Sequence, residues 1–452
     1  MSSKSIPQPI VMKFGGTSLK DSDRIQNAAQ LVSERKNQHP VVVTSAMSGV
    51  TSKLIETAEA ALEKNKTIVS ENLAWLHKVH FTTAKTPEVQ KEITRLFQKL
   101  EEHFTGVEML GELTPRTLDI ICSFGERLSS WLMLETLQSL GLSAERFDSR
   151  EFVRTNNQFG SAEISWDFTC PQIKKTLGPA LKKGIVPVIT GYIAATEDGQ
   201  TTTLGRGGSD YSASLCGVCL DATEIQIWTD VDGMMTADPR VIKNAKPLSQ
   251  ISFQEAAELA YFGAKVLHPK TIQPAIDAEI PVKILNTQNP TASGTTIIKD
   301  SPQTKNSIKA IAFKKGISVI NICSSRMLGP YGFLSKIFNT FAEHQVSVDT
   351  VATSEVSISA TVEDDSFTDE LIHDLEQFAR AKVIPNQTIL CVVGNGLKDD
   401  YRVEQKVFDT LAKNNIATEL ISKGASQINL TFIIPTKAAE KTVQCLHDTF
   451  FN

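Results

Sequence analysis

The chain has 452 residues, of which 41% are hydrophobic and 21% are charged, so its composition is that of an ordinary globular protein. At roughly 100–200 residues per domain, this length predicts two to four domains. The formal net charge of -5 argues against a nucleic-acid-binding protein, because such proteins usually present a basic face. It does not exclude a small polyanionic ligand, which a local cluster of Lys and Arg can bind.

The N-terminal sequence MSSKSIPQPI has no apolar signal core and is not an Arg-rich transit peptide, and no apolar run approaches the ~20 residues of a membrane helix. The seven cysteines are an odd and scattered set, which predicts reduced thiols rather than a disulfide framework. Cys216 and Cys219 form a CxxC that is either a redox or zinc motif or, as we favour, part of the small apolar face of a helix. These features predict a cytoplasmic enzyme with no membrane partner.

Short β-forming runs alternate with helical patterns in the first part of the chain. Apolar runs at 10–14, 41–46, 185–190 and 224–229 predict buried strands, and residues 21–35 have helical spacing. Strands separated by helices predict a mainly parallel sheet between helices, and such sheets bind ligands at the carboxyl ends of their strands. The residues that carry the chemistry should therefore follow the strands.

The segment from 54 to 113 is long, helical and poor in chemistry, and we interpret it as a helical insertion or a support for a lid. The composition changes near 286–306, which is rich in Pro, Ser, Thr and Asn and predicts a domain boundary. Beyond it, residues 336–362 align with 406–432 at a constant offset of 70 residues. Each copy reads as an amphipathic helix, a β-rich stretch, a turn and a strand, with no catalytic cluster. A duplicated, non-catalytic αβ module indicates a sensor.

Lys13 lies at the end of the first predicted strand, 10–14, and Gly15 and Gly16 follow that strand. Two glycines after a strand let backbone N–H groups approach a phosphate, and Lys13 can place a cation on a phosphoryl group in transfer. The motif is not a Walker A loop, because GxxxxGK[ST] is absent. Taken alone it is weak evidence for phosphate binding.

The run from Thr201 to Asp210, TTTLGRGGSD, is the most informative segment of the chain. Its three glycines expose backbone donors, and Arg206 offers a fork that suits a carboxylate or a phosphate. Ser209 is as well explained by a helix N-cap as by a ligand contact. The run as a whole predicts an anion-binding loop.

Three other motifs follow predicted strands or begin predicted helices. WTDVDG, with Thr229 and Asp230, could hold a ribose or a metal, or could be an acidic turn. In FGAKVLHP, Lys265 could meet phosphate, whereas a structural role suits His268 better. In SFGER, Glu126 could pair with an ammonium group or simply begin a surface helix.

Several glycine-bearing strand ends with Lys, Arg and Asp, and no Ser-His-Asp or Cys-His set, point to phosphoryl transfer. A carboxylate acceptor fits well, because it is already ionised at pH 7 and needs no general base. The enzyme then has only to align the reactants and to offset the charge on the phosphates.

Together, KFGGTS, SAMSGVTS, FGERLS, TTTLGRGGSDYSA, WTDVDG, DPR and FGAKVLHP resemble, in this order, the motifs of the aspartate kinases, a branch of the amino-acid kinase family. The C-terminal repeat resembles the tandem ACT domains of the same family. The resemblance covers nearly the whole chain and implies an α/β amino-acid kinase fold over residues 1–300. It also implies two βαββαβ ACT-like modules, at 308–384 and 387–452.

The resemblance implies transfer of the γ-phosphoryl group of MgATP to the side-chain carboxylate of L-aspartate, giving 4-phospho-L-aspartate, the first step toward lysine, methionine and threonine. Lys13 would stabilise the phosphoryl group between ATP and aspartate, and Asp210 would organise the reacting end. Glu126 would hold the ammonium of aspartate, and Arg206 its α-carboxylate. The other implied substrate contacts are Ser45, Thr51, Gly207, Gly208 and Ser209. The implied ATP contacts are Lys13, Gly15, Gly16, Thr229, Asp230, Arg240 and Lys265, and Mg²⁺ is expected mainly between the phosphates, with no protein ligand assigned.

The motifs depart from the family pattern at one position near the nucleotide. Lysine-sensitive bacterial members often carry Tyr six residues after the Thr of WTD, and Met235 stands there in this chain. A hydrogen bond to the nucleotide is therefore in doubt, and Met235 is not counted as a site residue.

The regulatory part also resembles an effector site of the family. Gly329-Pro330 replaces the His-Ser that is common in lysine-sensitive bacterial members, and the surrounding run resembles plant-type monofunctional members. L-Lysine is the expected inhibitor, because Asp349 and Glu355 can meet an ammonium, and S-adenosylmethionine is an implied co-effector. The implied effector contacts are Met327, Gly332, Phe333, Leu334, Ser347, Val348, Asp349, Ser354 and Glu355. Because ACT modules commonly pair across subunits, a homodimer or homotetramer is expected, and no fused homoserine dehydrogenase is expected after Asn452.

Two other functions remain open from the sequence. A kinase of another amino acid, such as glutamate, would still use Arg206 and Glu126. A non-catalytic amino-acid sensor would bind a ligand without turnover, although the intact Lys13, Arg206 and Asp210 argue against it.

Overall fold

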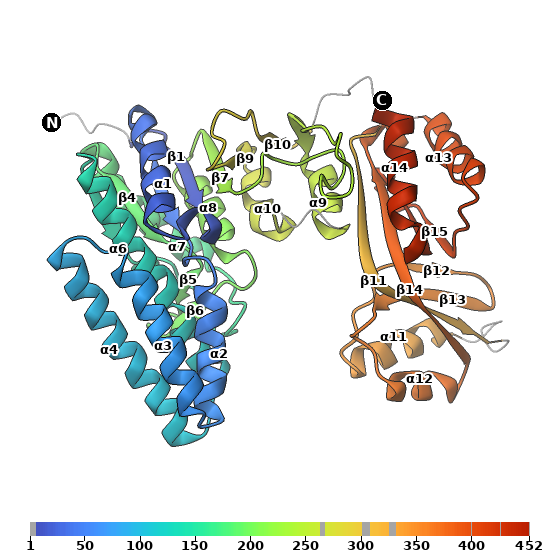
Figure 1. Ribbon diagram of the computed structural model, residues 1–452, viewed down its shortest axis with the longest axis horizontal. Helices are drawn as coiled ribbons and strands as arrows, with labels where there is room; N and C mark the ends of the chain where they lie inside the picture. The colour runs from blue at the N-terminus through green and yellow to red at the C-terminus, as the bar shows by residue number, and fades with distance from the viewer. Residues whose placement is uncertain are drawn as a thin grey trace. The chain divides into compact units, whose positions relative to one another are not determined.

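The computed structural model describes residues 6–262, 267–300, 308–324, 331–398, 400–424 and 426–451 (Figure 1). The chain forms two compact units, Met1–Met234 with Val266–Asp300, and Met235–Lys265 with Ser301–Asn452. The first unit therefore differs from the expected catalytic domain 1–300 by the segment 235–265. The boundaries of the expected domains stay predictions.

The first unit is built on a mainly parallel sheet, as the alternation of strands and helices predicts. Its strands follow the order β3-β4-β2-β1-β7-β9-β10, in which all neighbours are parallel except β9 and β10. The strands of this sheet are β1 (Ile10–Phe14), β2 (Val41–Thr44), β3 (Ala144–Phe147), β4 (Val186–Thr190), β7 (Glu224–Thr229), β9 (Val282–Asn286) and β10 (Thr295–Ile298). A separate antiparallel pair consists of β5 (Ile193–Ala195) and β6 (Thr201–Thr203).

Helices supply most of the rest of the first unit. They are α1 (Ser22–Glu34), α2 (Val50–Leu62), α3 (Lys66–Phe81), α4 (Pro87–Leu110), α5 (Pro115–Cys122), α6 (Phe124–Ser139), α7 (Trp166–Lys182), α8 (Gly208–Cys219) and α10 (Pro269–Asp277). Helix α4 shows how the sequence sets such a helix: Thr86 caps it, Pro87 opens it and Gly111, at φ 66°, ends it. Its buried residues recur at helical spacing from Val89 to Val107.

The segment 54–113 is helical, as expected, and it contributes to the main core of the first unit. Leu54, Leu76, Ile93 and Leu100 are buried in the same cluster as strand β1 and helix α6. Figure 1 shows α2, α3 and α4 as adjacent long helices. The interpretation as a helical insertion or a support for a lid is therefore incomplete, because these helices contribute to the core.

The second unit contains the C-terminal repeat. Its sheet has the order β12-β13-β11-β14-β16-β15 and is antiparallel between all neighbours. Its strands are β11 (Ala310–Cys323), β12 (Val351–Thr353), β13 (Ser357–Glu363), β14 (Arg380–Val393), β15 (Leu420–Ser422) and β16 (Asn429–Pro435). Its remaining elements are β8 (Gln250–Ser252), α9 (Phe253–Phe262), α11 (Phe333–Glu343), α12 (Asp369–Glu376), α13 (Tyr401–Lys413) and α14 (Ala439–Phe451).

The two copies of the repeat share their central strands. The long strands β11 and β14 pair along their whole lengths, from Ala310 opposite Val393 to Cys323 opposite Arg380. One end of β11 packs in a core with β16, α13 and α14, and the other end packs in a core with β13, α11 and α12. The core of each copy therefore includes parts of both β11 and β14, which lie outside the aligned segments 336–362 and 406–432.

The structure corrects one expectation about the cysteines. Cys170 on α7 and Cys219 on α8 form a disulfide with a Cα–Cα distance of 4.9 Å, so the prediction of reduced thiols is wrong for this pair. Cys216 is a buried free thiol on α8, which agrees with the apolar-face interpretation for that residue. Among the described residues, no helix is both long and apolar enough to cross a membrane.

Candidate active site

Four neighbouring strands of the first unit end beside one another, and polar loops follow all of them. In sheet order these strands are β4, β2, β1 and β7, and the residues that follow them are Tyr192, Ser45, Gly15 and Asp230. Parallel strands place such loops on the same edge of the sheet, where open α/β folds bind ligands. The structure thus places at one edge of the sheet these residues, which were expected to follow the strands.

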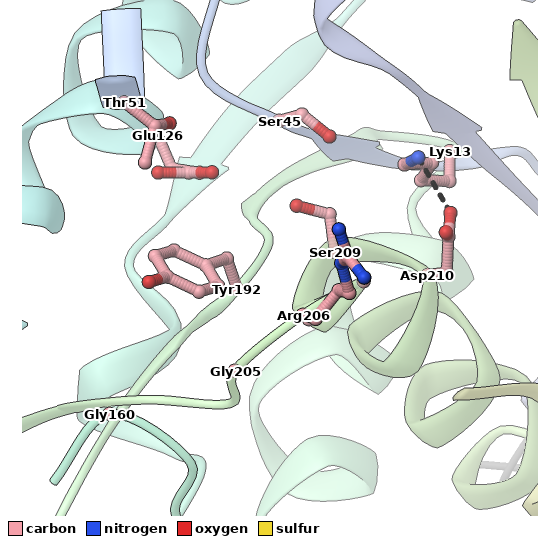
Figure 2. Close-up of a pocket in the computed structure, with 12 residues that line it drawn as sticks. Lys13, Ser45, Thr51, Glu126, Gly160, Tyr192, Gly205, Arg206, Ser209 and Asp210 are labelled. Carbon is pink, nitrogen blue, oxygen red and sulfur yellow. Dashed lines mark ion pairs between the residues drawn. The ribbon is translucent and has the colours of Figure 1, made fainter. Parts of the chain in front are cut away.

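A cavity of about 420 Å³ opens at this edge, and we call it the Arg206 cavity. Figure 2 shows Glu126 and Tyr192 at one side of it, the Lys13–Asp210 pair at the other, and Arg206 with Ser209 between them. The cavity is lined by Lys13, Ser45, Thr51, Glu126, Gly160, Tyr192, Gly205, Arg206, Gly207, Gly208, Ser209 and Asp210.

Lys13 is the one residue of β1 whose side chain is not fully buried. Its ammonium nitrogen lies 2.6 Å from Oδ1 of Asp210, and both side chains are only about one-tenth exposed. Asp210 is held there because it belongs to the first turn of α8. The pair places a fixed cation in the cavity with limited access to water, where its electrostatic effect is larger than in bulk solvent.

Glu126 lies in the first turn of α6 and is 3% exposed. Its Oε1 accepts a hydrogen bond of 3.0 Å from the backbone N–H of Ala46, while Oε2 has no protein partner within the described chain. The close approach depends on Gly125, since a Cβ there would lie 2.6 Å from the Cβ of Ala46. Burial raises the pKa of Glu126 to about 8, so the carboxyl is mostly neutral at pH 7.

The charge state of Glu126 predicts pH-dependent binding of any ammonium ligand. An ammonium at Oε2 would favour the ionised carboxylate, so binding below pH 8 should release up to one proton. Amino-acid affinity should therefore rise by up to about tenfold per pH unit between pH 6 and 8. Calorimetry at pH 7 in two buffers with different ionisation enthalpies measures this proton directly. Binding that is independent of pH and releases no proton would contradict the assignment.

The same pKa shift predicts that Glu126→Gln stabilises the protein while weakening ligand binding. Because the folded pKa of about 8 exceeds the ordinary value of 4.5, Glu126 opposes folding increasingly as the pH rises from 4.5 to 8. The variant should thus gain stability on the order of 3 kcal/mol at pH 7, and the gain should vanish below pH 4.5. Chemical denaturation at pH 4 and pH 7 measures the difference.

The segment Thr201–Asp210 forms strand β6, a turn and the beginning of α8. Gly205 and Gly207 both have φ near 72°, a left-handed conformation that favours glycine, and Gly207 is the N-cap of α8. Arg206 is exposed between these glycines and lines the cavity. Its guanidinium can thus bind an anionic group beside the positively polarised N-terminus of α8.

A second cavity of about 410 Å³ adjoins the first, and we call it the Gly15 cavity. The two cavities share Lys13, Ser45, Thr51 and Glu126 in their linings. The other residues of the Gly15 cavity are Gly15, Gly16, Thr17, Ala46, Met47, Ser48, Gly49, Ser52, Thr229 and Asp230. Lys13 therefore stands between two spaces, one with an exposed Arg and one with glycine-rich loops.

The structure brings most of the sequence-derived site residues together. All nine residues expected to be catalytic or to bind the substrate line the Arg206 cavity, and Gly15, Gly16, Thr229 and Asp230 line the Gly15 cavity. Arg240 belongs to the second unit, where its guanidinium donates to Asp238 at 2.6 Å. Lys265 falls outside the described residues.

Two residues that line the Arg206 cavity belong to none of the motifs found in the sequence. Tyr192, which has φ 67°, lies two residues after the end of β4. It could have been predicted, because ligand sites in such sheets form where the strands end. Gly160 lies in an irregular loop with no strand before it, and no sequence signal marks it. His268, expected to be structural, is the N-cap of α10, and a Cβ on Gly207 would lie 3.3 Å from its Cβ.

In the second unit, Asp349 is already engaged by side chains of its own chain. Its Oδ1 accepts a 2.7 Å hydrogen bond from the hydroxyl of Tyr261, and its Oδ2 lies 3.0 Å from the ammonium of Lys314. Ser354 hydrogen-bonds to Ser357 at 2.7 Å in the turn that also contains Glu355. The other expected effector residues, Gly332, Phe333, Leu334, Ser347 and Val348, lie at the start of α11 or before β12, and Met327 is outside the described part of the chain.

Comparison with protein families and curated proteins gives a consistent result over the whole chain. Residues 8–286 match the amino acid kinase family, and residues 320–369 and 390–450 match an ACT domain. Aspartokinase 2, chloroplastic, of Arabidopsis thaliana is 39% identical over 98% of this chain and 84% of its own length. The lysine-sensitive aspartokinase 3 of Escherichia coli is 36% identical over 98% of this chain and 99% of its own length.

Solved structures agree with the sequence comparisons. E. coli aspartokinase III in complex with aspartate and ADP, in its R-state, matches with a TM-score of 0.85 at 34% identity, covering 98% of this chain and 100% of that one. The same enzyme with lysine and aspartate, in its T-state, matches with a TM-score of 0.85 at 35% identity and the same coverage. The chain therefore belongs to the aspartokinases, a branch of the amino acid kinase family that carries ACT domains.

Proposed function

We propose that the chain transfers the γ-phosphoryl group of MgATP to the side-chain carboxylate of L-aspartate, giving 4-phospho-L-aspartate and ADP. The observation that carries this proposal is the position of Lys13, which lines both cavities and is paired with Asp210. The amino acid would occupy the Arg206 cavity and the phosphates the Gly15 cavity. The similar E. coli enzyme was solved in complex with aspartate and ADP, which supports an amino acid and a nucleotide as the two ligands.

The charges in the Arg206 cavity fit an amino acid in one orientation. Its ammonium would bind Glu126, which has a free oxygen atom, and its α-carboxylate would bind Arg206. Its side-chain carboxylate would then face Lys13 across the cavity, toward the phosphates (Figure 2). The acceptor is already ionised, so the reaction needs alignment and charge stabilisation rather than a base.

The glycine-rich loops of the Gly15 cavity suit the triphosphate. Gly16 allows two loops of this cavity to pack closely, because a Cβ there would lie 3.0 Å from the carbonyl oxygen of Ala46. Mg²⁺ would be carried mainly by the phosphates, and Asp230, which lines the same cavity, is a suitable carboxylate donor. When bound, the ion would offset charge on the phosphate oxygens.

The substrate assignment is tested by measuring ADP release with L-aspartate and with L-glutamate under the same conditions. We expect kcat/KM for aspartate to exceed that for glutamate by roughly 10–200-fold, because the two substrates differ by one methylene group. A preference for glutamate would assign the site to another amino acid, and binding of either ligand without ADP release would favour a sensor.

We further propose that L-lysine inhibits the enzyme by binding at Asp349 in the second unit. The similar E. coli enzyme with lysine supports this effector. Asp349 already accepts from Tyr261 and Lys314, so its surroundings suit a cationic or hydroxyl donor. An effector ammonium would compete with these two donors for the carboxylate.

Asp349→Ala should therefore raise the lysine concentration for half-inhibition by at least tenfold. Asp374→Ala is a matched control, because Asp374 is a half-exposed acid on α12 that pairs with His344. It should leave the inhibition as in the wild type. Inhibition curves with lysine are measured for the wild type and both variants. The effector assignment is wrong if millimolar lysine does not inhibit the wild type, or if it inhibits Asp349→Ala as strongly as the wild type.

A further inference from the structure

A buried carboxylate that has no part in the proposed reaction lies behind the wall of the Arg206 cavity. Asp119 on α5 is 3% exposed. Its Oδ2 accepts 2.9 Å hydrogen bonds from the backbone N–H groups of Gly160 and Thr203, and its Oδ1 accepts a 2.7 Å bond from the hydroxyl of Thr203. Burial raises the pKa of Asp119, while these donors act in the opposite direction by favouring the charged form.

The segments that Asp119 holds form one wall of the cavity. Gly160 lines the cavity directly, and Thr203 precedes Leu204 and the lining residue Gly205. The backbone N–H of Leu204 donates to the carbonyl of Tyr192 at 2.9 Å, which adds a third lining residue to the wall. A Cβ on Gly205 would lie 3.2 Å from the carbonyl oxygen of Gly160, so the two loops are in close contact.

Asp119 also connects this wall to the helix that carries Glu126. The backbone N–H of Ser123 donates to the carbonyl of Asp119, and the N–H of Arg127 donates to the carbonyl of Ser123, so hydrogen bonding continues from α5 into α6. Glu126 lies seven residues after Asp119, and Arg206 lies three residues after Thr203. One carboxylate thus ties together the two segments that present Glu126 and Arg206.

We propose that Asp119 is a positioning residue that fixes the separation of Glu126 and Arg206, and thereby the binding of the amino-acid substrate. The inference rests on the proposed function, in which these two groups hold the ammonium and the α-carboxylate. Asp119 itself does not line the cavity and acts only through Gly160 and Thr203. Loss of the hydrogen bonds from Gly160 and Thr203 to Asp119 should therefore weaken amino-acid binding and leave nucleotide binding unchanged.

Asp119→Asn tests the inference in the full-length enzyme. The asparagine amide has the same shape as the carboxylate, but an NH₂ group replaces one of the two acceptor oxygens. It therefore cannot accept all the hydrogen bonds that Gly160 and Thr203 donate to Asp119. The expected result is a rise of at least tenfold in KM for aspartate, with KM for ATP within twofold of the wild type. The ratio of kcat/KM for aspartate over glutamate should fall as well.

Glu135→Gln is the matched control. Glu135 is a carboxylate on α6 with 6% exposure that accepts backbone N–H bonds from Lys85 and Thr86, and it lines neither cavity. Both variants should lose stability in chemical denaturation, but only Asp119→Asn should change KM for aspartate. Thr203→Val, which removes a single donor to Asp119, should raise that KM by a smaller factor and serves if Asp119→Asn does not fold.

The outcomes separate this inference from the proposed function. If the wild type phosphorylates aspartate and neither Asp119→Asn nor Thr203→Val changes KM for aspartate, Asp119 is only structural and the inference is overturned. If the wild type prefers another amino acid, the proposed substrate is wrong, and the same comparison of KM values is made with that amino acid.

Discussion

Lys13→Ala is expected to reduce kcat by about a thousandfold, with the fold intact. Lys13 offers the fixed cation between the two cavities, and loss of one preorganised group that stabilises transition-state charge typically costs 10²–10³ in rate. The effect should fall mainly on kcat, because the cation matters most when charge redistributes between the phosphoryl group and the acceptor carboxylate. Steady-state kinetics with saturating aspartate and ATP measures it.

The variant needs a control for stability, because Lys13 is paired with the buried Asp210. Removing one partner leaves an unpaired carboxylate, which destabilises a protein by roughly 3–5 kcal/mol when the pair is fully buried. The double variant Lys13→Met with Asp210→Asn removes both charges and should recover stability without recovering turnover. Lys174→Ala removes a lysine paired with Asp221 at the surface and should be neutral. If Lys13→Ala retains activity within tenfold of the wild type, Lys13 is not part of the site.

Arg206→Ala is expected to lower kcat/KM for aspartate by several hundredfold. Arg206 is exposed and has no ion-pair partner among the described residues, so its removal should cost little stability. Its loss removes a charge-assisted, two-pronged contact with the α-carboxylate, worth about 3–4 kcal/mol. The expected signature is a large rise in KM for aspartate with an unchanged KM for ATP.

Two variants sharpen this test. Arg206→Lys keeps the charge and loses the planar fork, so its kcat/KM should lie between those of the wild type and Arg206→Ala. Arg95→Ala removes an arginine that pairs with Glu92 on the surface of α4 and should change neither KM. A rise in KM for ATP rather than for aspartate would place Arg206 on the nucleotide instead.

The strand-end residues could be predicted from the sequence because their signal is local. Lys13 lies at the end of an apolar β-forming run, and Gly15, Ser45 and Asp230 directly follow such runs. The topology of a parallel sheet brings these residues to one edge. The repeat in the second unit could be predicted because its sequence pattern recurs at a fixed offset of 70 residues.

Contacts between distant segments left no such signal. Asp119 and Thr203 are 84 residues apart, and nothing in the helix pattern of α5 marks a buried acid that binds a loop. The Cys170–Cys219 disulfide depends on how α7 packs against α8, which the spacing of the cysteines does not reveal. Strands β11 and β14 stand at the same offset of 70 residues, but each contributes to the cores of both copies, which the repeat in the sequence does not reveal.

The most direct test of the central claim identifies the product of the wild-type enzyme. Purified protein is incubated with MgATP, L-aspartate and hydroxylamine, which converts an acyl phosphate into a hydroxamate. The expected product is aspartyl hydroxamate with the hydroxamate on the side-chain carbonyl, formed in a one-to-one ratio with ADP and about a thousandfold more slowly by Lys13→Ala. ADP release without hydroxamate, or hydroxamate from glutamate in preference to aspartate, would contradict it.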